Sequence, residues 1–245
     1  MDLPWYCNYE PVDGATNPTL TLSNVTVDQI GTYQVKVAPP GYESVTSEFA
    51  GDAYIYDVSN PVIPGTLLCE IFNNIPFGRV EHLTSSKQYQ NNKPTFNRSL
   101  KTFEAPPTYG GSFGGNDYGI RVTGFIKPPK TGEYVFYLAS DDEGELYLST
   151  DESPDNLELV ASVKRGPSGI GNESGRTNKR AWGANPSAVS KSIHLEAGKR
   201  YSVKALMKED SGPEHLSVTW QKPGDEPPEP GDPPISGEYL EFEVK

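Results

Sequence analysis

The sequence has little cysteine. Its two cysteines, Cys7 and Cys69, lie far apart, and no CxxC pair or histidine stands at the spacing of a metal site. This pattern excludes a structural zinc site of the zinc-finger type. The chain is large enough to bury a core without disulfide staples, so both cysteines are expected to pack as small hydrophobic side chains. A disulfide between them stays open, and cysteine usage does not indicate the redox compartment.

Long hydrophobic runs are also missing. No stretch reaches the ~18 apolar residues that a membrane-spanning helix needs, so membrane insertion is not expected. The first ten residues, MDLPWYCNYE, have neither a basic start nor an apolar core, which is unlike a signal peptide. The chain is therefore expected to be either cytosolic or a piece of a longer protein. The incomplete domain at its N-terminus, considered below, favours a piece of a longer protein.

Positive charge is scarce relative to negative charge. Lys and Arg number 21 against 33 Asp and Glu, which gives a net charge of −12 and a pI near 4.7. Such a field repels a phosphate backbone, so nucleic acid is excluded as a partner. The same balance is compatible with divalent cations and with neutral sugars.

The residues that usually carry catalysis form no recognisable arrangement. Three histidines and two cysteines stand outside any nucleophile motif. A glycosidase needs two carboxylates facing each other across a cleft, about 5–10 Å apart. The most conspicuous acids, Asp141 and Asp142, are adjacent, which suits a metal ion better than a division between acid and base. The sequence therefore predicts a chain that is not an enzyme.

Glycine, proline and aromatic residues are plentiful. The 24 Gly and 23 Pro are scattered between short apolar runs, and 14 Tyr and 9 Phe favour a half-buried pleated surface. Runs such as IRVTGFIKPP and GEYVFYLASDDEGELYLST alternate with period 2. The sequence predicts an all-β protein whose main domain, residues 67–222, is an antiparallel β-sandwich with long loops.

The segments on either side of residues 67–222 differ from this domain in composition. Residues 58–66 contain prolines and a glycine and are expected to form a linker. Residues 223–245 are a Pro- and acid-rich tail, expected to be extended and unpacked, ending in one final strand. Residues 1–57 resemble the second half of an immunoglobulin-like domain. Trp5 and Tyr33 match that family's strand-C tryptophan and tyrosine corner, whereas its second cysteine is replaced by Val35. This partial domain is expected to act as a spacer.

The stretch ASDDEGELYLST, residues 139–150, places Asp141, Asp142 and Glu143 directly after a core strand. Taken alone, this acidic run is either a solvated turn or a cation site. Two adjacent side chains on an ordinary strand point to opposite faces, so the pair would need a bent backbone to hold one ion. Calcium takes 6–8 oxygen ligands, which carboxylates and carbonyls supply.

The block TGEYVFYLASDDEGELYL, the turn LEAGKRY and the closing VTW together resemble the protective-antigen-type domain, over residues 67–222. The resemblance implies a β-sandwich carried by secreted and surface proteins. In the sugar-binding members, two consecutive aspartates joined by a cis peptide bond hold Ca²⁺. Asp141 and Asp142 fall on that motif. A second loop, residues 208–216, is implied to add ligands, with Asp210 and Glu214 as the acids in its tip.

The implied ligand is a glycan or glycoconjugate whose hydroxyls complete the coordination of Ca²⁺. Trp182, in a polar insertion, is a candidate for stacking on a sugar ring, although a loop tryptophan also commonly fills the edge of a core. His215, next to the second loop, is a candidate hydrogen-bonding residue. The leading hypothesis is a calcium-dependent, lectin-like module in an extracellular or cell-surface multidomain protein. The alternative is a structural spacer or an adhesion module that contacts neighbouring domains without binding sugar.

Overall fold

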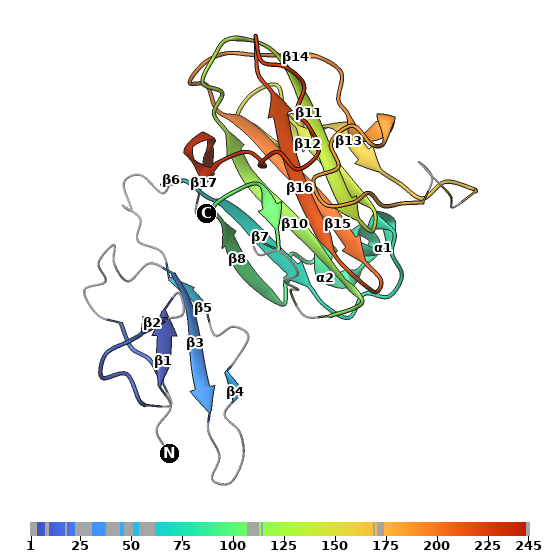
Figure 1. Ribbon diagram of the computed structural model, residues 1–245. Coiled ribbons are helices and arrows are strands. Elements are labelled where there is room, and N and C mark those ends of the chain that lie inside the picture. Colours follow the sequence, from blue (N-terminus) through green and yellow to red (C-terminus); the bar gives the residue numbers. More distant parts are fainter. Residues whose placement is uncertain are drawn as a thin grey trace. The chain divides into compact units, whose positions relative to one another are not determined.

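The computed structural model describes residues 4–7, 10–17, 19–22, 31–37, 45–46, 51–53, 62–106, 113, 115–168, 170 and 174–243. The chain divides into two compact units, residues 1–61 and 62–245 (Figure 1). Each unit has its own sheets and is described separately.

The smaller unit contains one antiparallel sheet in the order β2-β1-β3-β4, with β5 also pairing with β3. Its strands are β1 (Trp5–Cys7), β2 (Glu10–Pro11), β3 (Gly31–Val37), β4 (Val45–Thr46) and β5 (Gly51–Ala53). Trp5 lies opposite Val35, and Cys7 lies opposite Tyr33, which is buried. The alternating run PTLTLSNVTV, residues 18–27, favours a strand by its period of 2, but residues 19–22 form none and 23–27 lie outside the described residues. The immunoglobulin-like assignment stays a prediction.

The larger unit is an antiparallel sandwich of two sheets, as predicted (Figure 1). One sheet has the order β13-β12-β15-β10-β17-β6, with β7 pairing with β10 and β8 with β7, and the other has the order β14-β11-β16-β9. The strands are β6 (Val62–Pro64), β7 (Leu67–Phe72), β8 (Phe96–Leu100), β9 (Glu104–Ala105), β10 (Tyr118–Ile126), β11 (Gly132–Asp141), β12 (Gly144–Leu148), β13 (Glu158–Val163), β14 (Ile193–Leu195), β15 (Tyr201–Glu209), β16 (His215–Gln221) and β17 (Leu240–Glu243).

The core lies between these sheets and follows the alternation in the sequence. On β11, Tyr134, Phe136 and Leu138 are fully buried, and on β10 Val122 and Ile126 are fully buried. Each such side chain contributes roughly 1.5–3 kcal/mol by leaving water. The period-2 pattern thus places every second residue of these strands in the core.

Two short helices lie between β7 and β8. They are α1 (Val80–Ser85) and α2 (Lys87–Gln90), and α1 packs near β10 and β15 (Figure 1). Val80 and Leu83, three positions apart, bury the inner side of α1. A helix this short cannot show a sustained 3.6-residue period, which explains why the sequence pattern missed it. Among the described residues, no helix is long and apolar enough to cross a membrane.

The expected linker and tail are partly incorporated into the sandwich. Val62–Pro64 of the expected linker forms β6, which pairs with β17 near the end of the tail. Ile235 is buried, its amide donates to the Val218 carbonyl, and its carbonyl accepts from Phe103. The expectation of an unpacked tail is therefore wrong for this part, because an apolar residue among the prolines finds a place in the core. Both Cys7 and Cys69 are free, and burial raises the pKa of the Cys69 thiol well above its usual range.

Glu104 on β9 ties the long insertion after β13 to the sandwich. Arg180 donates to both of its oxygens at 2.7 and 2.9 Å, Lys179 lies 3.2 Å away, and Ser217 on β16 donates at 2.9 Å. The carboxylate is 3% exposed. Burial raises its pKa, but the hydrogen bonds from Arg180 and Ser217 and the charge of Lys179 outweigh burial, so the net pKa is lowered.

We expect Glu104→Gln to lower the free energy of unfolding at pH 7 by about 2–3 kcal/mol. This loss is smaller than the loss on breaking a fully buried ion pair, because Arg180 can reach solvent. The pKa of Glu104 is depressed in the folded state, so its contribution is present above about pH 4.5 and is lost as the pH falls. Urea unfolding from pH 3 to 7 should show the two proteins converging at low pH. Glu133→Gln, at an exposed ion pair with His194, is the control and should stay close to wild type. An unchanged Glu104→Gln protein would contradict the anchoring role.

Candidate cation and ligand site

The two adjacent aspartates stand at one end of the sandwich. Asp141 is the last residue of β11, and Asp142 follows in the short turn to β12. The peptide bond between them is cis, as the resemblance implied. Asp141 lies opposite His215, the first residue of β16. The β15–β16 loop, predicted to be the second ligand loop, therefore begins and ends at the strand ends beside the pair.

Asp142 is held by this second loop. It is 6% exposed, and its Oδ2 accepts a hydrogen bond from the amide of Asp210 at 3.1 Å. Its Oδ1 lies 3.6 Å from Nη2 of Arg165. Gly78, before α1, packs against the same carboxylate so closely that a Cβ there would stand 2.7 Å from Oδ2. The carboxylate is thus oriented from three sides.

Burial and mutual repulsion disfavour charge on the pair. The pKa of Asp141 is raised to about 6, first by burial and then by the charge of Asp142, with a smaller contribution from Glu214. Burial also raises the pKa of Asp142, although the Asp210 amide and Arg165 oppose it. Both carboxylates would therefore be stabilised as anions by a cation placed between them.

Glu209 is the residue that the sequence analysis missed. It ends β15 and is fully buried, and neither of its oxygens has a hydrogen-bond partner. Its pKa is raised to about 8, first by burial and then by the charges of Asp142, Glu214 and Asp141. The sequence does contain a signal for its burial. Tyr201, Val203 and Ala205 alternate toward the core, and the same alternation continues to position 209.

Lys208, beside Glu209, is a buried cation at the same strand end. It has no exposed surface, and its Nζ donates to the backbone carbonyl of Glu209. Burial lowers its pKa to about 8, although the charges of Asp117 and Asp210 oppose this. One lysine carries a single positive charge, which cannot balance all of the carboxylates around it.

The donor set fits a hard cation only in part. Among the described residues, no group of three or more His, Cys, Asp or Glu side chains is gathered closely enough to hold a metal ion. Asp210 reaches Asp142 through its backbone amide, and Glu214 acts on Asp141 through its charge. Side-chain coordination by Asp210 and Glu214 therefore stays a prediction. The oxygens of Asp141 and Asp142, the unpartnered oxygens of Glu209 and the loop carbonyls are the ligand types that Ca²⁺ takes.

Trp182 does not offer a stacking surface, so this prediction is wrong. It is 5% exposed, packs with Tyr137 and Ala139, and its indole Nε1 donates to the carbonyl of Asp232 at 3.0 Å. The tail covers the insertion and provides this acceptor, which the local sequence does not reveal. The alternative, a tryptophan that fills the edge of the core, is correct.

His215 lies beside Asp141 but is buried. It is 5% exposed, and its Nε2 has no hydrogen-bond partner. Burial, then the charge of Lys179, lowers its pKa to about 4, so the ring is neutral at pH 7. Its hydrogen bond to a ligand stays a prediction.

Two curated mouse proteins contain segments similar to this chain. N-acetyl-beta-glucosaminyl-glycoprotein 4-beta-N-acetylgalactosaminyltransferase 1 is 41% identical over 106 residues, which are 43% of this chain and 10% of that protein. Fibrocystin-L is 28% identical over 143 residues, which are 58% of this chain and 3% of that protein. The chain thus matches only a small part of these long relatives.

The fold is similar to a solved adhesin domain. The epithelial adhesin 9 A domain from Candida glabrata, solved in complex with Galb1-4GlcNAc, is 14% identical, with a TM-score of 0.50 over 75% of this chain and 91% of that domain. The model of the PA14 domain family matches residues 85–233, more than half of the chain. Together with the antiparallel sandwich, this match confirms the resemblance seen in the sequence: the chain belongs to the PA14 domain family.

Proposed function

We propose that the larger unit is a non-catalytic, calcium-dependent carbohydrate-binding module of a secreted or cell-surface multidomain protein. One observation carries the proposal: Asp141, which is partly buried, and Asp142, which is buried, repel each other, and the Asp210 amide and Gly78 hold the Asp142 carboxylate in place. A bound Ca²⁺ supplies the positive charge that compensates the two carboxylates. It also offers open coordination positions to which sugar hydroxyls can bind.

The roles of the protein residues follow from their contacts. Asp141 and Asp142 bind the cation, and the Asp210 amide keeps Oδ2 of Asp142 oriented. Glu209 is buried beside the pair without a side-chain hydrogen bond, and its raised pKa means that it becomes a further negative charge only when a cation binds nearby. Because the carboxylates are already fixed by the fold, little conformational freedom is lost when the ion binds.

A glycan or glycoconjugate is the proposed partner. The solved adhesin domain of similar fold carries a galactose-containing disaccharide, and one curated relative acts on glycoproteins according to its name. We infer a glycan-recognising part of a larger protein rather than its catalytic centre. Adjacent carboxylates that share one cation are poorly arranged for the separate acid and base roles of glycoside hydrolysis.

The first prediction concerns calcium and stability. A ligand at 100 times its Kd adds about 2.7 kcal/mol to the folded state, which corresponds to a Tm increase of roughly 5–10 °C for a unit of this size. We expect such an increase when Ca²⁺ replaces EDTA. Asp142→Asn should abolish it, and it should raise the Tm in EDTA, because it removes one of two repelling charges while keeping an acceptor for the Asp210 amide.

The matched control is Glu226→Gln, which removes an exposed carboxylate from the tail. Its response to Ca²⁺ should equal that of the wild type in differential scanning calorimetry. A wild-type Tm that is the same in EDTA and in millimolar Ca²⁺ would refute the cation site and favour the spacer function.

The second prediction uses the close approach of Gly78. An alanine Cβ would stand 2.7 Å from Oδ2 of Asp142, and the flexible carboxylate can move away more easily than the backbone. Gly78→Ala should therefore fold normally but bind Ca²⁺ about tenfold more weakly, since one charge-assisted ligand is displaced. Isothermal titration with Ca²⁺ measures this change.

Ser85→Ala, on the exposed side of α1, serves as the control for Gly78→Ala and should leave Ca²⁺ affinity unchanged. Wild-type affinity in the Gly78→Ala protein would show that the orientation of the Asp142 carboxylate is unimportant for the ion.

A further inference from the structure

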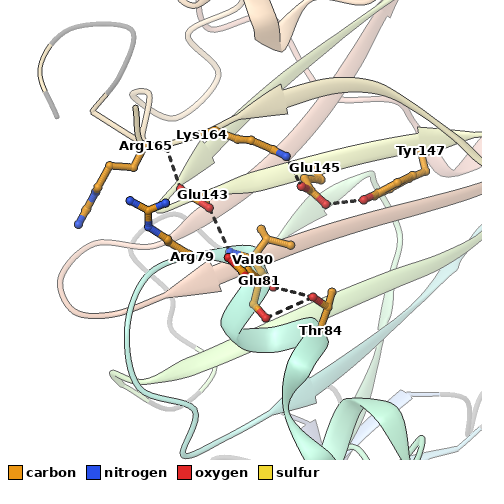
Figure 2. A pocket seen from close by; sticks show the side chains of 9 residues that line it. All are labelled: Arg79, Val80, Glu81, Thr84, Glu143, Glu145, Tyr147, Lys164 and Arg165. Carbon is orange, nitrogen blue, oxygen red and sulfur yellow. Dashed lines mark hydrogen bonds and ion pairs between the residues drawn. The ribbon is translucent and has the colours of Figure 1, made fainter. Parts of the chain in front are cut away.

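A polar hollow borders Asp142. It has a volume of about 340 Å³ and lies between the first turn of α1, the strand β12 and the residues after β13 (Figure 2). Two contacts connect it to the aspartate pair. Arg165 lines the hollow and lies 3.6 Å from Oδ1 of Asp142, and Arg79, also a lining residue, follows the glycine that packs on the same carboxylate.

Glu143 holds two walls of the hollow together. The amide of Val80 donates to its Oε2 at 3.1 Å, and the amide of Arg165 donates to its Oε1 at 2.8 Å. The side chain is 5% exposed. Both oxygens thus accept hydrogen bonds from the protein, and the start of α1 is fixed relative to the segment that carries Arg165.

Glu145 is also satisfied within the protein. Its carboxylate lies 2.8 Å from the ammonium of Lys164 and accepts a hydrogen bond from the hydroxyl of Tyr147. It is 8% exposed. Glu143 and Glu145 therefore add little negative potential toward a ligand in the hollow, because partners already compensate both carboxylates.

The two guanidinium groups are less engaged. Arg79 is exposed and takes part in no ion pair among the described residues, and Arg165 is 45% exposed with a single long contact, to Asp142. In Figure 2 their side chains lie to one side of the hollow, and Glu145 and Tyr147 lie to the other. Guanidinium groups bind carboxylates and sulfates through two parallel hydrogen bonds.

We propose that this hollow binds an anionic substituent, a carboxylate or a sulfate, on the glycan that is held at Asp141 and Asp142. This inference rests on the proposed function. A cation at the pair would neutralise Asp142 and release Arg165 from this contact, which is its one ion pair among the residues that the structure describes. The hollow therefore becomes more positive when the cation is bound. Glu81 on α1 also lines the hollow, but its carboxylate is exposed to solvent, so water and salt screen its charge.

The test compares matched glycans with Ca²⁺ present: neutral glycans, and the same glycans carrying one sulfate or one carboxylate. We expect the acidic forms to bind about tenfold more tightly in low salt, and this advantage to shrink in 0.5 M NaCl. Arg79→Gln should remove the preference while leaving neutral-glycan binding and the Ca²⁺-induced rise in Tm unchanged.

Lys191→Gln is the matched control. It removes one exposed positive charge just before β14, at the opposite end of the larger unit from α1 (Figure 1), and should keep the preference. Neutral glycans that bind as tightly as acidic ones would overturn this inference and leave the proposed function intact. Equal weakening of both classes by Arg79→Gln would also overturn it. If no glycan of either class binds, the proposed function and this inference both fail.

Discussion

The rest of the site depends on one constraint, the repulsion among carboxylates that the fold gathers at one end of the sandwich. Asp141 ends β11, Glu209 ends β15, and Asp142 starts the turn after β11, so three carboxylates gather where strands terminate. Asp142 and Glu209 are buried, and Asp141 is partly buried. Their pKa values rise because burial and mutual repulsion oppose ionisation. A buried cation, Lys208, offsets this only partly, and a divalent ion is the natural complement.

Three segments of the chain hold the Asp142 carboxylate in place. The Asp210 amide, Gly78 and Arg165 contact the Asp142 carboxylate directly. Glu143, the next residue, uses both oxygens to join α1 to the segment after β13. The proposed cation site and the neighbouring hollow therefore adjoin each other, with Arg165 in contact with Asp142 and also lining the hollow.

Several features could not be predicted from the sequence, because they depend on contacts between residues that are distant along the chain. Trp182 stood in a polar insertion and looked exposed, but the Asp232 carbonyl from the tail receives its indole N–H. Glu209 was not singled out beside Asp210 and Glu214, although the alternation of β15 points it inward. Helix α1 was missed because two apolar positions give too weak a periodic signal.

The sequence by itself determined the antiparallel sandwich, because period-2 alternation decides which side of each strand is buried. It also singled out Asp141 and Asp142, since adjacent acids after a core strand are conspicuous in one dimension. Only the tertiary structure decided which groups surround them. Gly78, Arg165 and Asp210 reach Asp142 from distant segments, and their approach depends on how sheets and loops pack, a property that local pattern does not encode.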